Sequence, residues 1–438
     1  MPPQRADLET VRLATLLRPG DGVVWGQALA TPAGLVRRLI DEAGRIGHLS
    51  AFIGVALGDA LDAAIGTGLA FSSFGAMHAA RRLHKAGMLD VIPMLYSAVP
   101  KALAAGRIPC DVALVQLSPP GPDGSHSLGF CNDFLPYAIA GARLVIGEVN
   151  PHVPWTRMDR PLDLSRFDII VESDEAPPWQ TAPVPGAAEE AIAARLAALI
   201  DDGATLQYGI GAVPTAMLRA LSSHRDLGIH SGLLTDELVE LVRQGAVTNA
   251  RKEVLPGRTI GGVAIGSPRL RDFLHDNPAV ELHPIATTHG AGTLSRLSRL
   301  VAVNSALEVD IHGQINAEML GSRYVGGIGG QFDYMHAAAA AERGLSVIAL
   351  PSTTRPSGAS RIVPALSGHC VTTCRSAVDV VVTEHGVADL RGRSQEQRAR
   401  DIIAIADPAH RDALERANPL RPRVHAATGP TERGAPRR

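Results

Sequence analysis

The chain has 438 residues, 45% of them hydrophobic, so it is long enough to form two or three domains with buried cores. Its 42 basic and 44 acidic residues give a net charge of −2, which excludes an overall polyanion-binding character, and we predict no nucleic-acid partner. No apolar run approaches the roughly 20 residues that a membrane span needs, and the N-terminal sequence MPPQRADLETVR lacks the apolar core of a signal peptide. The four cysteines, Cys110, Cys131, Cys370 and Cys374, are too few and too scattered for a disulfide framework, so we predict a protein of the reducing cytoplasm that does not associate with membranes.

Strand-like and helix-like segments alternate through the first part of the chain. Short apolar runs at 22–25, 49–55, 111–117 and 143–149 predict strands. Helical spacing at 31–43 and 74–86 predicts helices, the first beginning at a Thr-Pro pair that is typical of a helix start. This alternation predicts an α/β fold with mixed or parallel sheets covered by helices, in which ligands bind beyond the carboxyl ends of strands.

A proline-rich segment, EAPPWQTAPVPG at 175–186, predicts an extended linker between two lobes. We predict one α/β domain over residues 1–180, a second over residues 187–420, and a disordered tail at 421–438. The second domain continues the same alternation. Its predicted elements are a helix at 187–201, a strand at 205–208, a glycine turn at 209–212, a helix at 214–221 and strands at 300–304, 346–350 and 378–383.

The stretch richest in glycine is VGGIGGQFDYMHAA at 325–338, with four glycines within five positions. It precedes a predicted helix at 335–342. Glycine allows a backbone to approach a ligand closely, and free N–H groups at a helix start can face an anionic or carbonyl-bearing group. The spacing matches neither the dinucleotide-binding fingerprint nor the phosphate loop, so a tight structural turn is an equal alternative.

Three further loops are candidates for a site: the turn at 209–214, the segment GIHSGLLTD at 228–236, and the polar loop at 352–361. Thr235 and Asp236 are suited to cap a helix at 237–244. The sequence has no serine-hydrolase elbow and no zinc-protease motif. Cys370 and Cys374 lie near His369 but lack a second ligand pair, so we predict no metal site. The residues alone predict a two-lobed α/β enzyme without naming its substrate.

Seven motifs, in this order, resemble the acetyl-CoA hydrolase/transferase family, which includes 4-hydroxybutyrate and butyrate CoA-transferases. The resemblance extends from about residue 22 to about residue 414. The motifs are LSPPGPDG at 117–124, IGEVNPHVPWT at 146–156, LQYGIGAVP at 206–214, GIHSGLLTD at 228–236, INAEMLGSRYVGGIGGQFDYMHAA at 315–338, SRIVPAL at 360–366 and VVVTEHGVADLRG at 380–392. The resemblance implies two similar α/β domains with the active site between them, and a homodimer.

The resemblance also implies a reaction: CoA transfer between a small acyl-CoA and a carboxylate, with the coenzyme A thioester as substrate and no permanently bound cofactor. An enzyme carboxylate attacks the thioester and becomes a glutamyl-CoA thioester, which an acceptor carboxylate then resolves. The motifs carry over a set of CoA- and acyl-binding residues, and the oxyanion contacts of Ser357 and Gly358. The binding residues are Gly209, Gly211, Asn304, Gly327, Gly329 and Gly330.

One departure from the family pattern concerns the nucleophile. The resemblance implies a nucleophilic glutamate directly after Ser231, where this chain has Gly232. Glycine has no nucleophile, so three hypotheses stay open. A displaced carboxylate, with Glu237 preferred over its neighbour Asp236 and over Glu281, would support CoA transfer.

The second hypothesis is that the chain is an acyl-CoA hydrolase, in which Gly232 leaves space for a water that a group such as His230 activates. The third is that it is a non-catalytic CoA-ester-binding subunit or paralogue. Such a subunit would form a hetero-oligomer with a homologue that carries the glutamate.

Overall fold

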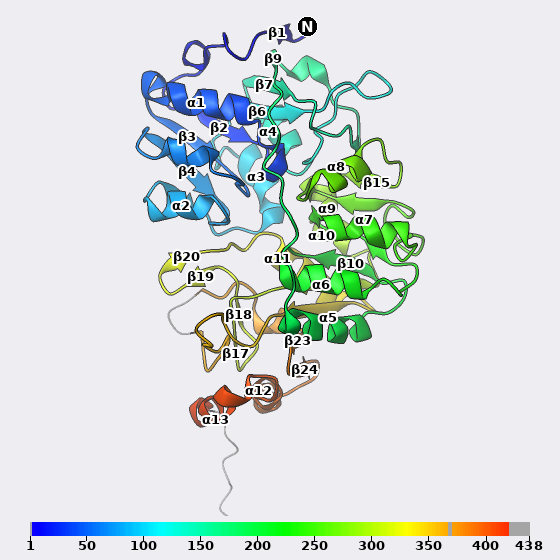
Figure 1. Ribbon diagram of the computed structural model, residues 1–438. Helices are drawn as coiled ribbons and strands as arrows, with labels where there is room; N and C mark the ends of the chain where they lie inside the picture. The colour runs from blue at the N-terminus through cyan, green and yellow to red at the C-terminus, as the bar shows by residue number, and fades with distance from the viewer. Residues whose placement is uncertain (1, 367–369, 420–438) are drawn as a thin grey trace, which may run out of the picture.

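The structure is a computed structural model that describes residues 2–366 and 370–419 (Figure 1). The tail predicted at 421–438 lies outside these residues. Two lobes are stacked, with the N-terminal lobe above the C-terminal lobe in the view of Figure 1. Each is built on a mainly parallel sheet covered by helices, which confirms the predicted α/β class.

The N-terminal lobe contains an eight-stranded parallel sheet in the order β1-β9-β7-β6-β2-β3-β4-β5. Alternate side chains of these strands enter two separate cores, because successive residues of a strand face opposite sides. Helices α1 and α2 cover one face, and α3 and α4 cover the other. The bounds are β1 (Gln4–Arg5), β2 (Gly22–Trp25), β3 (Leu49–Phe52), β4 (Leu69–Ser73), β5 (Leu89–Val91), β6 (Val112–Leu117), β7 (Leu144–Val149), β9 (Ile169–Glu172), α1 (Ala33–Ile46), α2 (Ala80–Lys85), α3 (Val99–Ala104) and α4 (Leu135–Gly141).

The C-terminal lobe contains a six-stranded sheet in the order β11-β10-β16-β21-β23-β24, which is parallel except for the β23–β24 hairpin. The strands are β10 (Thr205–Tyr208), β11 (Gly228–Ile229), β16 (Leu300–Asn304), β21 (Leu345–Ala349), β23 (Val380–Thr383) and β24 (Gly386–Asp389). The helices are α5 (Ala187–Leu199), α6 (Ala212–Ala220), α7 (Asp236–Arg243), α8 (Pro268–Leu274), α9 (Ile285–Thr288), α10 (Ala291–Leu294), α11 (Gln331–Ala340), α12 (Gln395–Ala404) and α13 (Pro408–Ala417).

Small sheets complete this lobe, and one of them includes a strand from the N-terminal part of the chain. They are β12 (Leu233–Leu234) with β14 (Val263–Ala264), β13 (Thr259–Gly261) with β15 (Val280–Leu282) and β8 (Arg157–Met158), β17 (Glu308–Asp310) with β18 (Ile315–Asn316) and β22 (Ile362–Val363), and β19 (Met319–Leu320) with β20 (Arg323–Tyr324). Residues 173–186 contain no helix or strand, and Figure 1 shows them as an extended trace between β9 and α5.

The glycine-rich loop at 325–330 joins the two lobes. The N–H of Ala76 donates to the carbonyl of Gly326 at 2.8 Å, and Gly75 and Gly327 form a backbone bridge. A Cβ on Gly327 would lie 2.7 Å from the carbonyl oxygen of Phe74, closer than atoms can approach. This contact also explains why α2 begins at Ala80 rather than at 74 as predicted, since residues 74–76 pair with the other lobe.

Helix α11 begins at Gln331, four residues before the predicted start at 335. Asp333 lies in its first turn and accepts hydrogen bonds from the backbone N–H of Ser97, at 3.1 Å, and from the Ser97 hydroxyl, at 2.6 Å. The glycine loop is therefore a structural junction at Gly326 and Gly327, and the start of α11 is fastened to the N-terminal lobe.

We expect Gly327→Ala to destabilise the junction between the lobes by about 1–3 kcal/mol, the usual cost of overpacking. Differential scanning calorimetry should show a lower Tm for this variant. Gly44→Ala is the matched control, because Gly44 lies in α1 with open space around its Cβ position and alanine is a good helix residue. An unchanged Tm for Gly327→Ala would contradict the close contact.

Candidate active site

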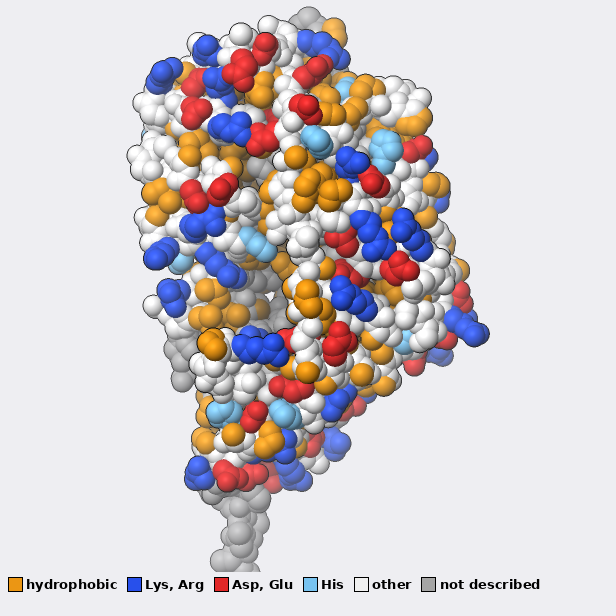
Figure 2. All heavy atoms as spheres, in the orientation of Figure 1, with side chains coloured by type: hydrophobic (Ala, Val, Ile, Leu, Met, Phe, Trp, Pro, Cys, Tyr) orange, Lys and Arg blue, Asp and Glu red, His pale blue; other side chains and the backbone are white. Residues whose placement is uncertain are grey.

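A cleft of about 200 Å³ lies where the two lobes meet. Both sheets point their carboxyl ends at it: Val55 and Phe74 follow β3 and β4, while Tyr208 and Asn304 end β10 and β16. Most of its wall is apolar, and Gln27, Tyr96, Gln207, His289, Asn304 and Gln331 contribute polar groups. In Figure 2 the surface is hollowed between the lobes, and basic and acidic side chains are interspersed over the face shown.

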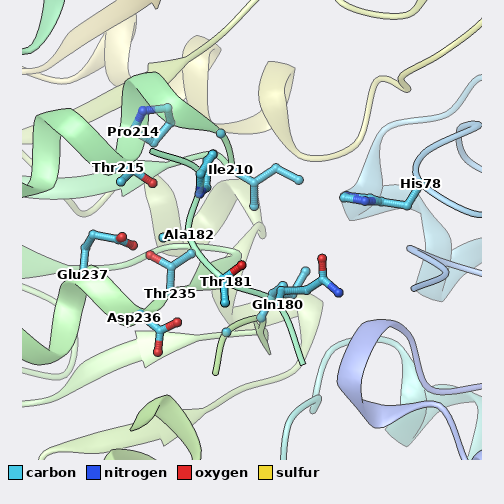
Figure 3. A pocket seen from close by; sticks show the side chains of 15 residues that line it. His78, Gln180, Thr181, Ala182, Ile210, Pro214, Thr215, Thr235, Asp236 and Glu237 are labelled. Atoms are coloured by element: carbon cyan, nitrogen blue, oxygen red, sulfur yellow. The ribbon is translucent and has the colours of Figure 1, made fainter. Parts of the chain in front are cut away.

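A second cavity, of about 280 Å³, adjoins the first and shares Gly209, Ile210 and Ile265 with it. Figure 3 shows this cavity with His78 on one side and Thr235, Asp236 and Glu237 on the opposite side. His78 belongs to the N-terminal lobe, so both cavities are bordered by both lobes.

The structure brings together most of the glycines that the motifs singled out. Gly232, Gly329 and Gly330 border the cleft, Gly209 borders both cavities, and Gly211 borders the second. Gly211 precedes α6 with φ +121°, a conformation that glycine adopts without strain. Gly327 borders neither cavity, because it packs against Gly75.

Asn304 lies on the cleft wall at the end of β16, where its amide pairs with that of Gln207. Its Nδ2 donates to Gln207 Oε1 at 2.9 Å, and Gln207 Nε2 donates to Asn304 Oδ1 at 3.3 Å. Adjacent parallel strands place these two side chains side by side, and the paired amides hold both in fixed orientations.

The carboxylates proposed as displaced nucleophiles lie outside the cleft. Glu237 borders the second cavity, 8% exposed, and pairs with Arg219 at 3.7 Å. Asp236 accepts hydrogen bonds from the backbone N–H and hydroxyl of Ser267, so it fastens the start of α8 instead of capping its own helix as predicted. Glu281 pairs with Arg258 and His283, each at 3.0 Å, and borders neither cavity.

Ser357 and Gly358 lie in an exposed loop beside α13. Ser357 Oγ is 2.7 Å from Thr354 Oγ1, and the carbonyl of Gly358 accepts a hydrogen bond from His410 Nε2 at 2.9 Å. Neither residue borders the two cavities, so their proposed oxyanion contacts stay a prediction.

His289 is a residue of the cleft that no sequence motif indicated. Its imidazole lies between two tyrosine rings, with centroids 4.9 Å from Tyr96 and 4.8 Å from Tyr334, and the residue is 4% exposed. Burial lowers the pKa of His289 to about 3, so its ring is neutral at pH 7. His230, the histidine we predicted as a water-activating group, is buried with Nε2 3.1 Å from the carbonyl of Thr287, and does not border the cleft.

Tyr96 is itself held by a buried polar network. Its hydroxyl donates to Asp133, and Gln27 Nε2 donates to both of these groups while Gln27 Oε1 accepts from the N–H of Val55 at 2.9 Å. Burial raises the pKa of Asp133 and raises that of Tyr96 well above its usual value. The network fixes one of the two rings that enclose His289.

Within the described residues, no three His, Cys, Asp or Glu side chains are grouped as a metal site would require. His369, which we considered beside Cys370 and Cys374, lies outside those residues. None of the helices across 2–366 and 370–419 combines the length and apolar character that crossing a membrane demands.

Comparison with known proteins places both lobes among CoA-processing enzymes. Residues 8–179 match the acetyl-CoA hydrolase/transferase N-terminal domain, and residues 266–418 match the C-terminal domain of the same name. A 4-hydroxybutyrate coenzyme A transferase of Clostridium kluyveri is 40% identical over 75% of this chain and 77% of its own length. A succinyl-CoA:acetate/propanoyl-CoA:succinate CoA transferase of Fasciola hepatica is 36% identical over 77% of this chain and 71% of its own.

A solved structure shares the fold over nearly the whole chain. The crystal structure of a 4-hydroxybutyrate CoA-transferase from Porphyromonas gingivalis superposes with a TM-score of 0.79 and 32% identity, covering 94% of this chain and 96% of that one.

Proposed function

This chain belongs to the acetyl-CoA hydrolase/transferase family, and we propose that it transfers coenzyme A between the thioester of a small carboxylic acid and a second carboxylate. The observation that carries this proposal is the pair of joined cavities between the lobes, at the carboxyl ends of both sheets. We propose no permanently bound cofactor, since coenzyme A enters as part of the substrate.

The dimensions of the cleft favour a short acyl group. Its volume of about 200 Å³ is below the range of about 300–1,000 Å³ found for drug-sized ligands. The apolar wall suits an aliphatic chain, while the paired amides of Gln207 and Asn304 offer polar contacts to a carbonyl or carboxylate. The adjoining cavity gives the rest of the thioester a path along Gly209 and Ile210.

We propose that Glu237 contacts the substrate without attacking the thioester. It borders the second cavity and lies next to Arg219, whereas the acyl group would occupy the cleft. We expect Glu237→Gln to leave kcat within about threefold, because the pair with the exposed Arg219 contributes little. Steady-state kinetics measures this, and a loss of kcat beyond about 100-fold would identify Glu237 as the displaced nucleophile.

The proposed activity is tested with the purified full chain, a panel of short acyl-CoA donors and isotopically labelled carboxylates. If the protein transfers CoA, the labelled carboxylate is converted to its CoA thioester, and no net free thiol is released. Both products are measured in the same tube, by mass spectrometry and by a thiol reagent. The proposal fails if no acceptor in the panel becomes a CoA thioester.

Hydrolysis is the second candidate, because the neutral imidazole of His289 borders the cleft, where it could activate a water against the carbonyl of a bound thioester. Free thiol formed without any acceptor would favour it. If neither product forms, the third hypothesis, a non-catalytic subunit acting with a glutamate-containing homologue, is favoured.

We further propose that the protein acts in the cytoplasm, and that it is a homodimer, as the resemblance to CoA-transferases implies. Light scattering of the purified chain measures its mass directly. A monomeric mass would contradict the dimer and leave the proposed activity untouched.

A further inference from the structure

The imidazole of His289 is packed between two tyrosine rings in the cleft wall. Tyr96 of the N-terminal lobe and Tyr334 of α11 enclose it at interplanar angles of 67° and 64°, edge-to-face arrangements that favour aromatic contact. Asp133 and Gln27 anchor the Tyr96 hydroxyl, and the Tyr334 hydroxyl donates to the carbonyl of Thr288 at 2.7 Å. The ring is therefore held from both lobes.

Two glycines face the Nε2 edge of this ring. A Cβ on Gly232 would lie 2.7 Å from Cε1 and 2.8 Å from Nε2, and a Cβ on Gly330 would lie 2.3 Å from Nε2. These glycines come from separate elements, the segment between β11 and β12 and the start of α11. A side chain at either position and the imidazole exclude each other, so His289 occupies the space in which a side chain at position 232 would begin.

Thr288 is the hydrogen-bonding partner of the Nδ1 side of the ring. Its Oγ1 lies 2.8 Å from His289 Nδ1 and 3.4 Å from the carbonyl of Pro284, which can only accept. We assign the proton to Nδ1: the hydroxyl then donates to Pro284 and accepts from Nδ1–H, and Nε2 is left unprotonated on the side of the two glycines. The described part of the chain supplies no hydrogen-bond partner to Nε2.

The other side chains that border the cleft are weaker nucleophiles. Among the described residues there, none is Asp, Glu, Cys, Ser or Lys. The tyrosines, Tyr96, Tyr208 and Tyr334, are buried, and burial raises the pKa of each, which keeps the hydroxyls protonated. A neutral imidazole is a nucleophile without first losing a proton.

We propose that His289 Nε2 is the nucleophile of this site and carries the acyl group between the donor and the acceptor. This inference rests on the proposed CoA transfer and specifies how it occurs without a carboxylate at position 232. Nε2 attacks the thioester carbonyl carbon, the C–S bond breaks, and an acylimidazolium and the CoA thiolate form as an ion pair.

The remaining steps regenerate the free histidine and use only the acceptor carboxylate and the CoA thiolate. The acceptor carboxylate attacks the acyl carbon and displaces the imidazole, which gives a mixed anhydride. The CoA thiolate attacks the acceptor carbonyl of this anhydride and releases the donor carboxylate. One thioester and one carboxylate are consumed, one of each is formed, and the net proton count is unchanged.

Trapping with a doubly labelled donor distinguishes this route from others. The full chain is mixed, without acceptor, with a short acyl-CoA that carries ¹⁴C in the acyl group and ³H in the coenzyme. The reaction is quenched rapidly, the protein is digested, and the labelled peptides are identified. Acyl label without coenzyme label on the peptide that contains His289 is the expected result. Coenzyme label on a glutamate-containing peptide, or no acyl label in a preparation active in transfer, overturns the inference.

Variants provide an independent measurement. We expect His289→Gln to lower kcat by at least about 100-fold, while His283→Gln, at a buried histidine outside both cavities, keeps activity near that of the unmodified protein. Retained activity in His289→Gln would overturn the inference while leaving CoA transfer intact. An inactive unmodified protein would instead remove the proposed function itself.

Thr288 is a positioning residue in this account, and its variants remain informative if His289→Gln folds poorly. Thr288→Val removes the acceptor for Nδ1–H and should lower kcat with little change in KM, because ring orientation matters after the substrate is bound. Thr288→Ser keeps the hydroxyl and should restore most of kcat. Equal activity in the valine and serine variants would contradict the assigned tautomer.

Discussion

Gly330→Ala is expected to abolish activity and to lower stability by about 3 kcal/mol. The new methyl group would lie 2.3 Å from His289 Nε2, and the imidazole cannot retreat because Tyr96 and Tyr334 enclose it. Either the ring or the start of α11 must move, and each movement disturbs the cleft. Gly232→Ala should have the same effect in weaker form, since its Cβ would lie 2.7 Å from the ring.

Calorimetry and steady-state kinetics of the same preparations measure both effects. A Tm lower by roughly 5 °C is expected for Gly330→Ala. Gly292→Ala is the matched control, because its Cβ position has open space and it borders neither cavity. Normal activity and Tm in Gly330→Ala would show that the imidazole does not occupy this space.

Acid is expected to destabilise the protein strongly between pH 6.5 and pH 4. Burial lowers the pKa of both His230 and His289 to about 3, whereas in the unfolded chain both regain the ordinary value of about 6.5. Between these values the unfolded chain binds more protons, so the free energy of unfolding falls as the pH falls. Each histidine contributes about 1.4 kcal/mol for every pH unit below 6.5.

The contribution of His289 is isolated by comparing two proteins across the same pH range. Tm is measured from pH 7 to pH 4.5 for the unmodified chain and for His289→Gln. The variant should lose less stability on acidification, because glutamine does not titrate. The titratable groups around His289 are Tyr96 and Tyr334, which contact the ring, and His230, whose charge adds to the effect of burial in lowering the pKa of His289. All three are present in both proteins. Parallel curves would contradict a buried neutral His289.

The alternation of strands and helices predicted much of the fold, because local periodicity determines which faces are buried. The strands at 22–25, 205–208 and 300–304 lie at their predicted positions. The predicted starts of α11 and α2 were wrong, because both starts depend on contacts between the lobes. Asp333 contacts Ser97 at the start of α11, and Gly75 pairs with Gly327 ahead of α2. Contacts of this kind leave no periodic signal in a sequence.

Some of the residues that border the two cavities could be singled out from the sequence. Glycines such as Gly209 and Gly330 stand out in the sequence, because glycine is concentrated where a backbone adopts an unusual conformation or approaches another group closely. His289 lies in a segment without a motif, and its importance comes from what surrounds it in space, namely two tyrosines from separate lobes and two glycines from separate loops. Gly232 stood out in the sequence because the family resemblance implies a glutamate there, but the imidazole that lies beside Gly232 was not predicted.

The central claim is that the acyl group of a CoA thioester occupies the cleft between the lobes, against His289. A crystal structure of the protein with a non-reactive thioether analogue of a short acyl-CoA tests it most directly. The account predicts the analogue's carbonyl carbon within about 3.5 Å of His289 Nε2, beside Gly232 and Gly330, with the coenzyme chain passing Gly209. An analogue bound with its carbonyl group outside the cleft would contradict the claim.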